Sequence, residues 1–212
     1  MQTQRTYYHL IIDKSGSMSD CLDNTISGFN EQLDMIRRLQ LEHPNQQILT
    51  GLTSFNELVK HHFFDAPADK PRPLSRQDYR PNGTTALLDA IGQASLRLEE
   101  IINSDTTHPS TAVVVIITDG YENSSQNFNL GQIRSLIQRL EATEKWTFSF
   151  IGATLDAVNV ATEMSIGKQN SHYFGKEEMK SEVWDKLSGS LTSYLRKKEK
   201  GSDIRNLFDE EK

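Results

Sequence analysis

The chain has 212 residues, enough for one well-buried domain with little room for a second. Its 23 Lys and Arg against 29 Asp and Glu give a formal net charge of −6, so no overall field attracts a polyanion such as nucleic acid. The single cysteine, Cys21, excludes an intramolecular disulfide framework, and no apolar run is long enough to cross a bilayer or form a signal-peptide core. We therefore expect a soluble cytoplasmic protein with neither nucleic-acid nor membrane partners.

The predicted elements alternate between strand and helix along most of the chain. Runs of β-branched and aromatic residues indicate strands, and apolar residues at intervals of three and four indicate helices with one buried face. In the first helix, Ile26, Phe29 and Leu33 follow that spacing. We expect strands at 7–12, 48–55, 58–64, 113–117, 146–151 and 171–174, and helices at 20–40, 85–102, 130–144, 156–164 and 177–198.

One connection departs from this alternation. The strands at 48–55 and 58–64 are separated by only two residues, and so short a link predicts an antiparallel hairpin. The following stretch, 65–83, is rich in Pro, Asp, Arg and Ser and predicts a surface loop. Tyr79 in this loop could help line a recognition surface, but a solvated loop residue is the simpler interpretation. The whole pattern predicts an α/β fold: a mostly parallel sheet of about six strands, one antiparallel edge strand, and helices on both faces.

Two predicted strands end in an aspartate, Asp13 and Asp119. If these strands are parallel neighbours, both carboxylates lie at the carboxyl edge of the sheet, where ligands of such folds bind. Ser15 and Ser17 stand two residues apart in the turn after Asp13, so their hydroxyls can point to a common centre. Thr84, just before a predicted helix, can bring another hydroxyl from the loop side.

Three neutral hydroxyls and two carboxylates suit a small hard cation such as Mg²⁺, which tolerates water in its remaining positions. If the aspartates act partly through water, the ion keeps much of its charge and an open position. It would then attract a carboxylate from another molecule. The residues therefore predict a metal-mediated contact with an acidic partner.

The pattern Asp13-x-Ser15-x-Ser17, then Thr84, then Thr118-Asp119-Gly120 resembles the metal ion-dependent adhesion site of the von Willebrand factor type A domain family. The five motif positions are filled in the family's order, and the combination is far more specific than Asp-x-Ser-x-Ser alone. The resemblance implies a doubly wound, Rossmann-like sheet, Mg²⁺ or Mn²⁺ binding, and recognition of a protein partner's Asp or Glu, without catalysis.

Carried over by position, the resemblance implies that Ser15 and Ser17 bind the ion directly. Thr84 would bind directly or through water, and Asp13 and Asp119 mainly through waters.

The likeness extends over about residues 5 to 198 and is strongest to bacterial cytoplasmic single-domain members, down to Gly152-Ala153-x-x-Asp156-Ala157. From the length and the charged terminus, we expect a domain at 1–198 followed by a flexible tail at 199–212. Movement of the last helix, coupled to metal coordination in this family, would involve 177–198 here. Asn82, where a glycine often stands, departs slightly from the pattern.

Several features also have simpler explanations. Asp13, Ser15 and Ser17 could merely cap the first helix. Glu122 and Asn123 are expected to be solvated loop residues. His61 and His62 are adjacent on a strand and therefore face opposite sides, so at most one could join a metal site.

Two other functions remain open. A Mg²⁺-dependent phosphohydrolase could use Asp13 as nucleophile, although such enzymes need a second aspartate where Ser15 stands. Alternatively, the fold could be a scaffold that uses another face. A further hypothesis is that Asp209, Glu210 or Glu211 of the tail supplies the acidic ligand to a neighbouring molecule's metal.

Overall fold

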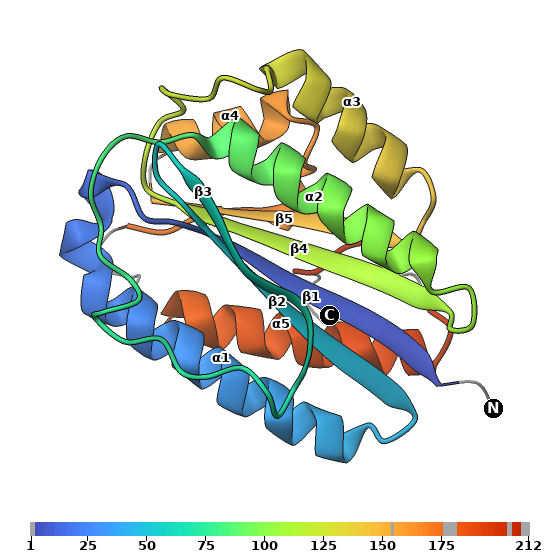
Figure 1. Cartoon of the computed structure of the whole chain (residues 1–212). Helices are drawn as coiled ribbons and strands as arrows, with labels where there is room; N and C mark the ends of the chain where they lie inside the picture. Colours follow the sequence, from blue (N-terminus) through green and yellow to red (C-terminus); the bar gives the residue numbers. More distant parts are fainter. Residues whose placement is uncertain (1–2, 154, 176–181, 203–204, 209–212) are drawn as a thin grey trace.

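The computed structural model describes residues 3–153, 155–175, 182–202 and 205–208 and contains one six-stranded sheet (Figure 1). The strand order is β3-β2-β1-β4-β5-β6. All neighbouring strands are parallel except β2 and β3, which form the antiparallel hairpin predicted from the sequence. The strands are β1 (Gln4–Asp13), β2 (Gln46–Phe55), β3 (Val59–Pro67), β4 (Ser110–Thr118), β5 (Trp146–Gly152) and β6 (Ser171–Tyr173).

Helices cover both faces of the sheet, as expected. Figure 1 shows α1 (Leu22–Glu42) and α5 (Glu182–Glu199) on one face, and α2 (Leu87–Ser104), α3 (Leu130–Glu141) and α4 (Leu155–Glu163) on the other. Two short 3₁₀ helices, η1 (Gly16–Cys21) and η2 (Lys168–Asn170), precede α1 and β6. The fold is that predicted, a mixed α/β sheet between two helical layers.

The burial of the strands explains why the sequence pattern was readable. In β1 and β4 nearly every residue is buried, because helices cover both faces, and such strands read as continuous apolar runs. The edge strand β3 instead leaves four residues exposed. His61 and His62 do contact different neighbours in β2, Thr53 at 3.0 Å and Ser54 at 2.9 Å, as expected for residues on opposite faces.

The end of the chain differs in part from the expected tail. Within the range 199–212, Leu207 and Phe208 are only 1% and 6% exposed and join the core beneath α1 and α5. The Asn170 amide holds this segment, because it donates to the Arg205 carbonyl at 3.0 Å and accepts from the Leu207 amide at 2.9 Å. The hypothesis about the last acidic residues, 209–211, and the expected helix start at 177 both concern positions outside the described residues.

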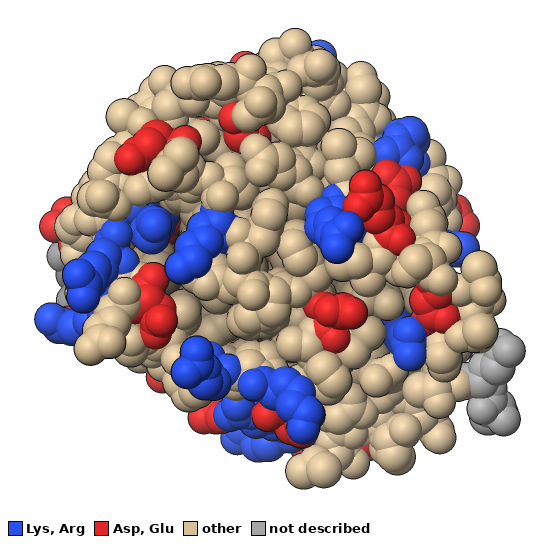
Figure 2. Space-filling view, viewed as in Figure 1, with Lys and Arg blue, Asp and Glu red and all other residues tan. Residues whose placement is uncertain are grey.

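The described helices include none that combines the length and apolar character needed to span a membrane. On the face drawn in Figure 2, acidic and basic side chains are interspersed among uncharged ones.

Candidate metal centre

The fold brings Asp13 and Asp119 together at the carboxyl edge of the sheet. β1 and β4 are parallel neighbours, with Ile12 beside Ile117, so the residues that follow them meet. The Thr118 hydroxyl donates to Asp13 Oδ2 at 2.6 Å, and the Ser17 hydroxyl donates to Asp119 Oδ1 at 2.5 Å. Asp13 is fully buried and Asp119 is 5% exposed. Both aspartates therefore belong to one hydrogen-bonded cluster.

The turn after β1 places both serines in the same cluster. The Ser15 amide donates to Asp13 Oδ1 at 2.6 Å, which folds the chain back over the carboxylate. The hydroxyl oxygens of Ser15 and Ser17 lie 3.1 Å apart. Gly16 opens η1, and its amide donates to the Gly83 carbonyl at 3.1 Å, which joins this turn to the loop before α2. The helical path thus begins earlier than the predicted residue 20.

The third hydroxyl comes from Thr85, whereas the sequence pointed to Thr84. A Cβ atom built on Gly120 would lie 2.8 Å from Thr85 Oγ1, 3.2 Å from Asp13 Oδ2 and 3.4 Å from Ser15 Oγ. Thr85 is buried, whereas Thr84 is exposed and its amide donates to Glu57. Among the described residues, no hydrogen bond joins the hydroxyl of either threonine to Asp13 or Ser15, so burial and proximity distinguish the two. The structure favours Thr85 over Thr84.

Asn123 and Glu122, both expected to be solvated loop residues, hold Thr85 and the start of α2 in place. The Asn123 side chain accepts from the Thr85 amide at 2.9 Å, and the Asn123 amide donates to the Thr85 carbonyl at 3.0 Å. Glu122 accepts from the Leu88 amide at 2.9 Å and so caps the start of α2. The sequence offered no signal for these roles beyond their position just after Asp119.

Tyr79 was also expected among solvated loop residues, and that expectation is wrong. Its side chain is 1% exposed, and its hydroxyl donates to the Asp13 carbonyl at 2.5 Å. Burial raises the pKa of this phenol well above its usual value, so Tyr79 remains a donor. The Pro-rich loop lacks apolar periodicity, and sequence reasoning therefore missed a residue that fixes the end of β1.

The electrostatics of the cluster favour a cation. Burial raises the pKa of Asp13 to about 6, and the nearby Asp119 carboxylate acts in the same direction, against hydrogen bonds from Thr118 and Ser15 that lower it. A buried carboxylate beside a second one is stabilised by positive charge. No residue contributing to this centre is Lys, Arg or His. The five side chains of the centre supply no positive charge, and a bound cation would stabilise both carboxylates in their ionised form.

The donor set fits a hard divalent cation. Three hydroxyl and two carboxylate side chains offer only oxygen, which Mg²⁺ prefers. Gly120 avoids crowding these oxygens, because a Cβ atom at its position would lie close to Thr85 and to Asp13 and Ser15 of the turn after β1. Among the described residues, no group of three or more His, Cys, Asp or Glu could form a metal site of another kind. These side chains can thus hold Mg²⁺ or Mn²⁺.

Comparison with solved structures identifies the fold. The vWF domain of the type V pili tip protein Mfa5 from Porphyromonas gingivalis matches with a TM-score of 0.64 and 10% identity, covering 91% of this chain and 96% of that one. Proximal thread matrix protein 1 from the mussel byssus matches with a TM-score of 0.58 and 17% identity, covering 89% of this chain and 46% of that one. The pilus adhesin SpaC from Lactobacillus rhamnosus GG matches with a TM-score of 0.62 and 11% identity, covering 91% of this chain and 30% of that one.

These likenesses establish that the chain has the fold of von Willebrand factor type A domains. No protein-family model matches the chain, and no curated protein matches it in sequence. The chain spans about half the length of the mussel protein.

Proposed function

We propose that this chain is a protein-interaction module that binds Mg²⁺ or Mn²⁺ through Asp13, Ser15, Ser17, Thr85 and Asp119. The observation that carries the proposal is the convergence of these two carboxylates and three hydroxyls at the carboxyl edge of a von Willebrand factor type A fold. When bound, the ion would offer a Lewis-acidic position to a carboxylate oxygen of the partner. The chain's own residues hold and orient that ion.

The surroundings of the centre support a protein partner. Three of the five large apolar side chains that are exposed among the described residues lie at this edge: Leu58 at 71%, Tyr121 at 53% and Tyr173 at 46%. Leu58 follows β2, Tyr121 follows the Asp119 turn, and Tyr173 ends β6. Exposed aromatic and aliphatic groups around a polar centre are typical of protein interfaces. Several structural neighbours are pilus proteins by name, among them an adhesin.

Absence of catalysis is part of the proposal. A phosphohydrolase with Asp13 as nucleophile needs a general acid or base beside it. Both oxygens of the Asp13 carboxylate instead accept hydrogen bonds, from the Ser15 amide and the Thr118 hydroxyl. Turnover of a generic phosphate ester that is lost in Asp13→Asn would favour the hydrolase.

Metal binding is tested by thermal unfolding with and without Mg²⁺. An ion at one hundred times its dissociation constant stabilises the folded state by about 2.7 kcal/mol. We expect this gain for the wild type and its loss in Asp13→Ala. A melting temperature indifferent to both Mg²⁺ and Mn²⁺ would overturn the proposal.

The partner is tested by capture from the native cell on the immobilised chain. We expect a protein retained in Mg²⁺ and released by a chelator, and absent when Asp13→Ala is used. Capture that ignores both the chelator and the substitution would instead support a scaffold that uses another face.

A further inference from the structure

A separate cavity of about 750 Å³ opens at the amino edge of the sheet, where β1, β4 and β5 begin. The ends of α2, α3 and α5 complete its walls. This volume lies in the range of small-molecule sites in proteins. The candidate metal centre lies at the carboxyl ends of the same strands, so the two sites share none of their side chains.

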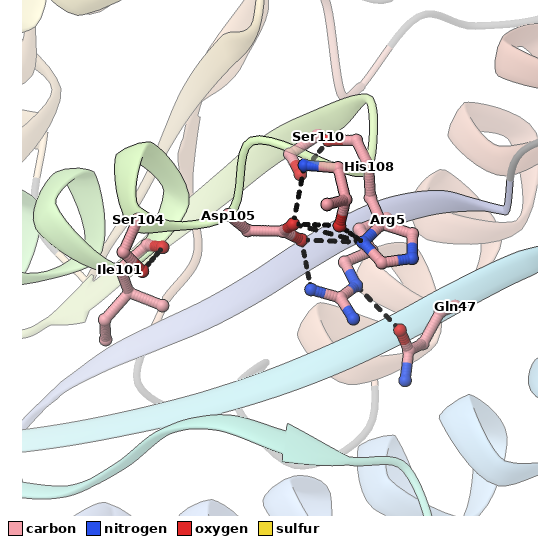
Figure 3. Close-up of polar contacts among 8 residues, drawn as sticks. Arg5, Gln47, Ile101, Ser104, Asp105, His108 and Ser110 are labelled. Atoms are coloured by element: carbon pink, nitrogen blue, oxygen red, sulfur yellow. Dashed lines mark hydrogen bonds and ion pairs between the residues drawn. The ribbon is translucent and has the colours of Figure 1, made fainter.

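Both carboxylates that line this cavity already have cationic partners. Asp105 is paired with Arg5 and with His108, whose Nδ1 lies 2.9 Å from Asp105 Oδ2, and Figure 3 shows both side chains in contact with the Asp105 carboxylate. Hydrogen bonds, those from Thr107 first, hold the pKa of Asp105 well below its usual range. The Arg139 guanidinium donates two hydrogen bonds to the Glu99 carboxylate, from Nη1 to Oε1 at 2.5 Å and from Nη2 to Oε2 at 2.8 Å. The acidic residues therefore contribute no net negative charge.

Two lysines of the cavity have no such partner. Lys198 Nζ donates to the Arg5 carbonyl at 2.8 Å, the Thr6 hydroxyl at 2.7 Å and the Thr111 hydroxyl at 2.9 Å, all of which are neutral oxygens. No ion pair among the described residues joins Lys198 or Lys145 to a carboxylate. Burial lowers the pKa of Lys198 to about 8, so its ammonium is still mostly protonated at neutral pH. The cavity thus carries two uncompensated positive charges in a chain of net charge −6.

The remaining polar wall is rich in hydroxyl groups. Four threonines and two serines line it: Thr106, Thr107, Thr111, Thr143, Ser110 and Ser202. Several of these hydroxyls already donate within the chain, among them Thr107 to Asp105, Ser110 to the His108 carbonyl and Thr143 to the Leu140 carbonyl. Their oxygens still accept, which suits a ligand that carries hydroxyls of its own. Two ammonium groups match a group with two negative charges, and a phosphate monoester carries about −1.5 to −2 at pH 7.

We propose that this cavity binds a small phosphorylated polyol, such as a sugar phosphate, with its phosphate near Lys145 and Lys198 and its hydroxyls against the threonine and serine wall. Lys145 is exposed and can reach the phosphate directly. Lys198 acts through its field, because its three protons already bind chain oxygens.

The test is isothermal titration calorimetry of the full chain with ribose 5-phosphate, inorganic phosphate and ribose, in the presence of EDTA so that metal binding plays no part. We expect saturable binding of ribose 5-phosphate, weaker binding of inorganic phosphate and none of ribose. Loss of one charge-assisted contact in Lys145→Ala should weaken binding about tenfold or more. Lys168→Ala, an exposed lysine on η2, is the matched control and should bind as the wild type does.

Lys198→Met should weaken binding as well, and Lys145→Ala answers the question if the Lys198 variant does not fold. Absence of binding at millimolar ribose 5-phosphate, or equal affinity in wild type and Lys145→Ala, would overturn the proposal. Equal affinity for inorganic phosphate and ribose 5-phosphate would overturn its polyol part.

Discussion

At Gly120 a single hydrogen atom occupies a position where any other residue would place a carbon. That carbon would lie 2.8 Å from Thr85 Oγ1 and 3.2 Å from Asp13 Oδ2. We therefore expect Gly120→Ala to abolish the stabilisation by Mg²⁺ measured in thermal unfolding, as Asp13→Ala does. Gly189→Ala is the control, because nothing lies within 4 Å of its added methyl group. Retention of the full Mg²⁺ effect in Gly120→Ala would place the ion elsewhere.

The two adjacent threonines offer a sharper test of the ligand set. Thr85 is buried beside Asp13, and Thr84 is exposed beside Glu57. We expect Thr85→Ala to weaken Mg²⁺ binding at least tenfold in a titration followed by melting temperature, equivalent to about 1.4 kcal/mol. Thr84→Ala should bind as the wild type does. The opposite order would return the role to Thr84.

His9 gives the fold a dependence on acid. It is 1% exposed, its Nε2 lies 2.9 Å from Thr53 Oγ1, and burial lowers its pKa to about 3. Below pH 6.5, His9 binds a proton in the unfolded chain, where its pKa is near the ordinary 6.5, but stays neutral in the folded chain. The contribution of His9 is therefore complete above pH 6.5 and falls by about 1.4 kcal/mol per unit as the pH drops toward 3.

The measurement is the free energy of urea unfolding between pH 4 and pH 7 for wild type and His9→Gln. We expect a shallower slope in the variant, since the other titrating groups are common to both. Identical slopes would show that His9 has the same pKa in the folded and the unfolded chain, which would contradict the effect of burial.

Among the elements, the chain end after α5 contributes more to stability than a tail would. Leu207 is 1% exposed, and Leu→Ala substitutions at such positions cost about 2–5 kcal/mol. We expect that loss for Leu207→Ala in urea unfolding. Leu41→Ala, at a side chain 82% exposed, should change the free energy by less than about 0.5 kcal/mol. Equal effects of the two substitutions would contradict the packing of this segment.

The elements themselves were largely predictable, and the reason is burial. Strands covered on both faces must be apolar throughout, so 113–117 lies within β4, and a two-residue link allows only a hairpin, so β2 and β3 were paired correctly. The strand ends were less readable, since ladder hydrogen bonds extend β4 to Ser110 through two polar residues, Ser110 and Thr111, and the small Ala112.

The candidate site was predictable only where a side chain follows directly from a strand end. Asp13, Ser15, Ser17 and Asp119 lie together because β1 and β4 are neighbours. The choice between two consecutive threonines depends instead on tertiary hydrogen bonds between Thr85 and Asn123, which no local pattern encodes. Tyr79 was missed for the same reason, because its partner is the Asp13 carbonyl, 66 residues away.

On the scale of the whole molecule, the sheet ends at two dissimilar edges. β6 has only three residues, and β3 carries exposed Lys60, His61 and Asp65 before it ends at Pro67. The pairing of β2 with β3 also shifts register near Leu52. Short strands, charges, bulges and proline all disfavour the addition of a foreign strand.

Replacing Lys60 and Asp65 by valine should therefore make the chain self-associate, as measured by sedimentation at increasing protein concentration. The same double substitution at exposed Lys168 and Asp185, away from the edge of β3, should leave it unchanged. If the variant chain stays monomeric at all concentrations, the two charges are not what prevents self-association, and the bulge and Pro67 suffice.

The register shift between β2 and β3 also affects how the whole molecule can associate. The irregular pairing of β3 disfavours lateral addition of strands, so association through the proposed metal centre is expected to stay separate from growth along the sheet edge.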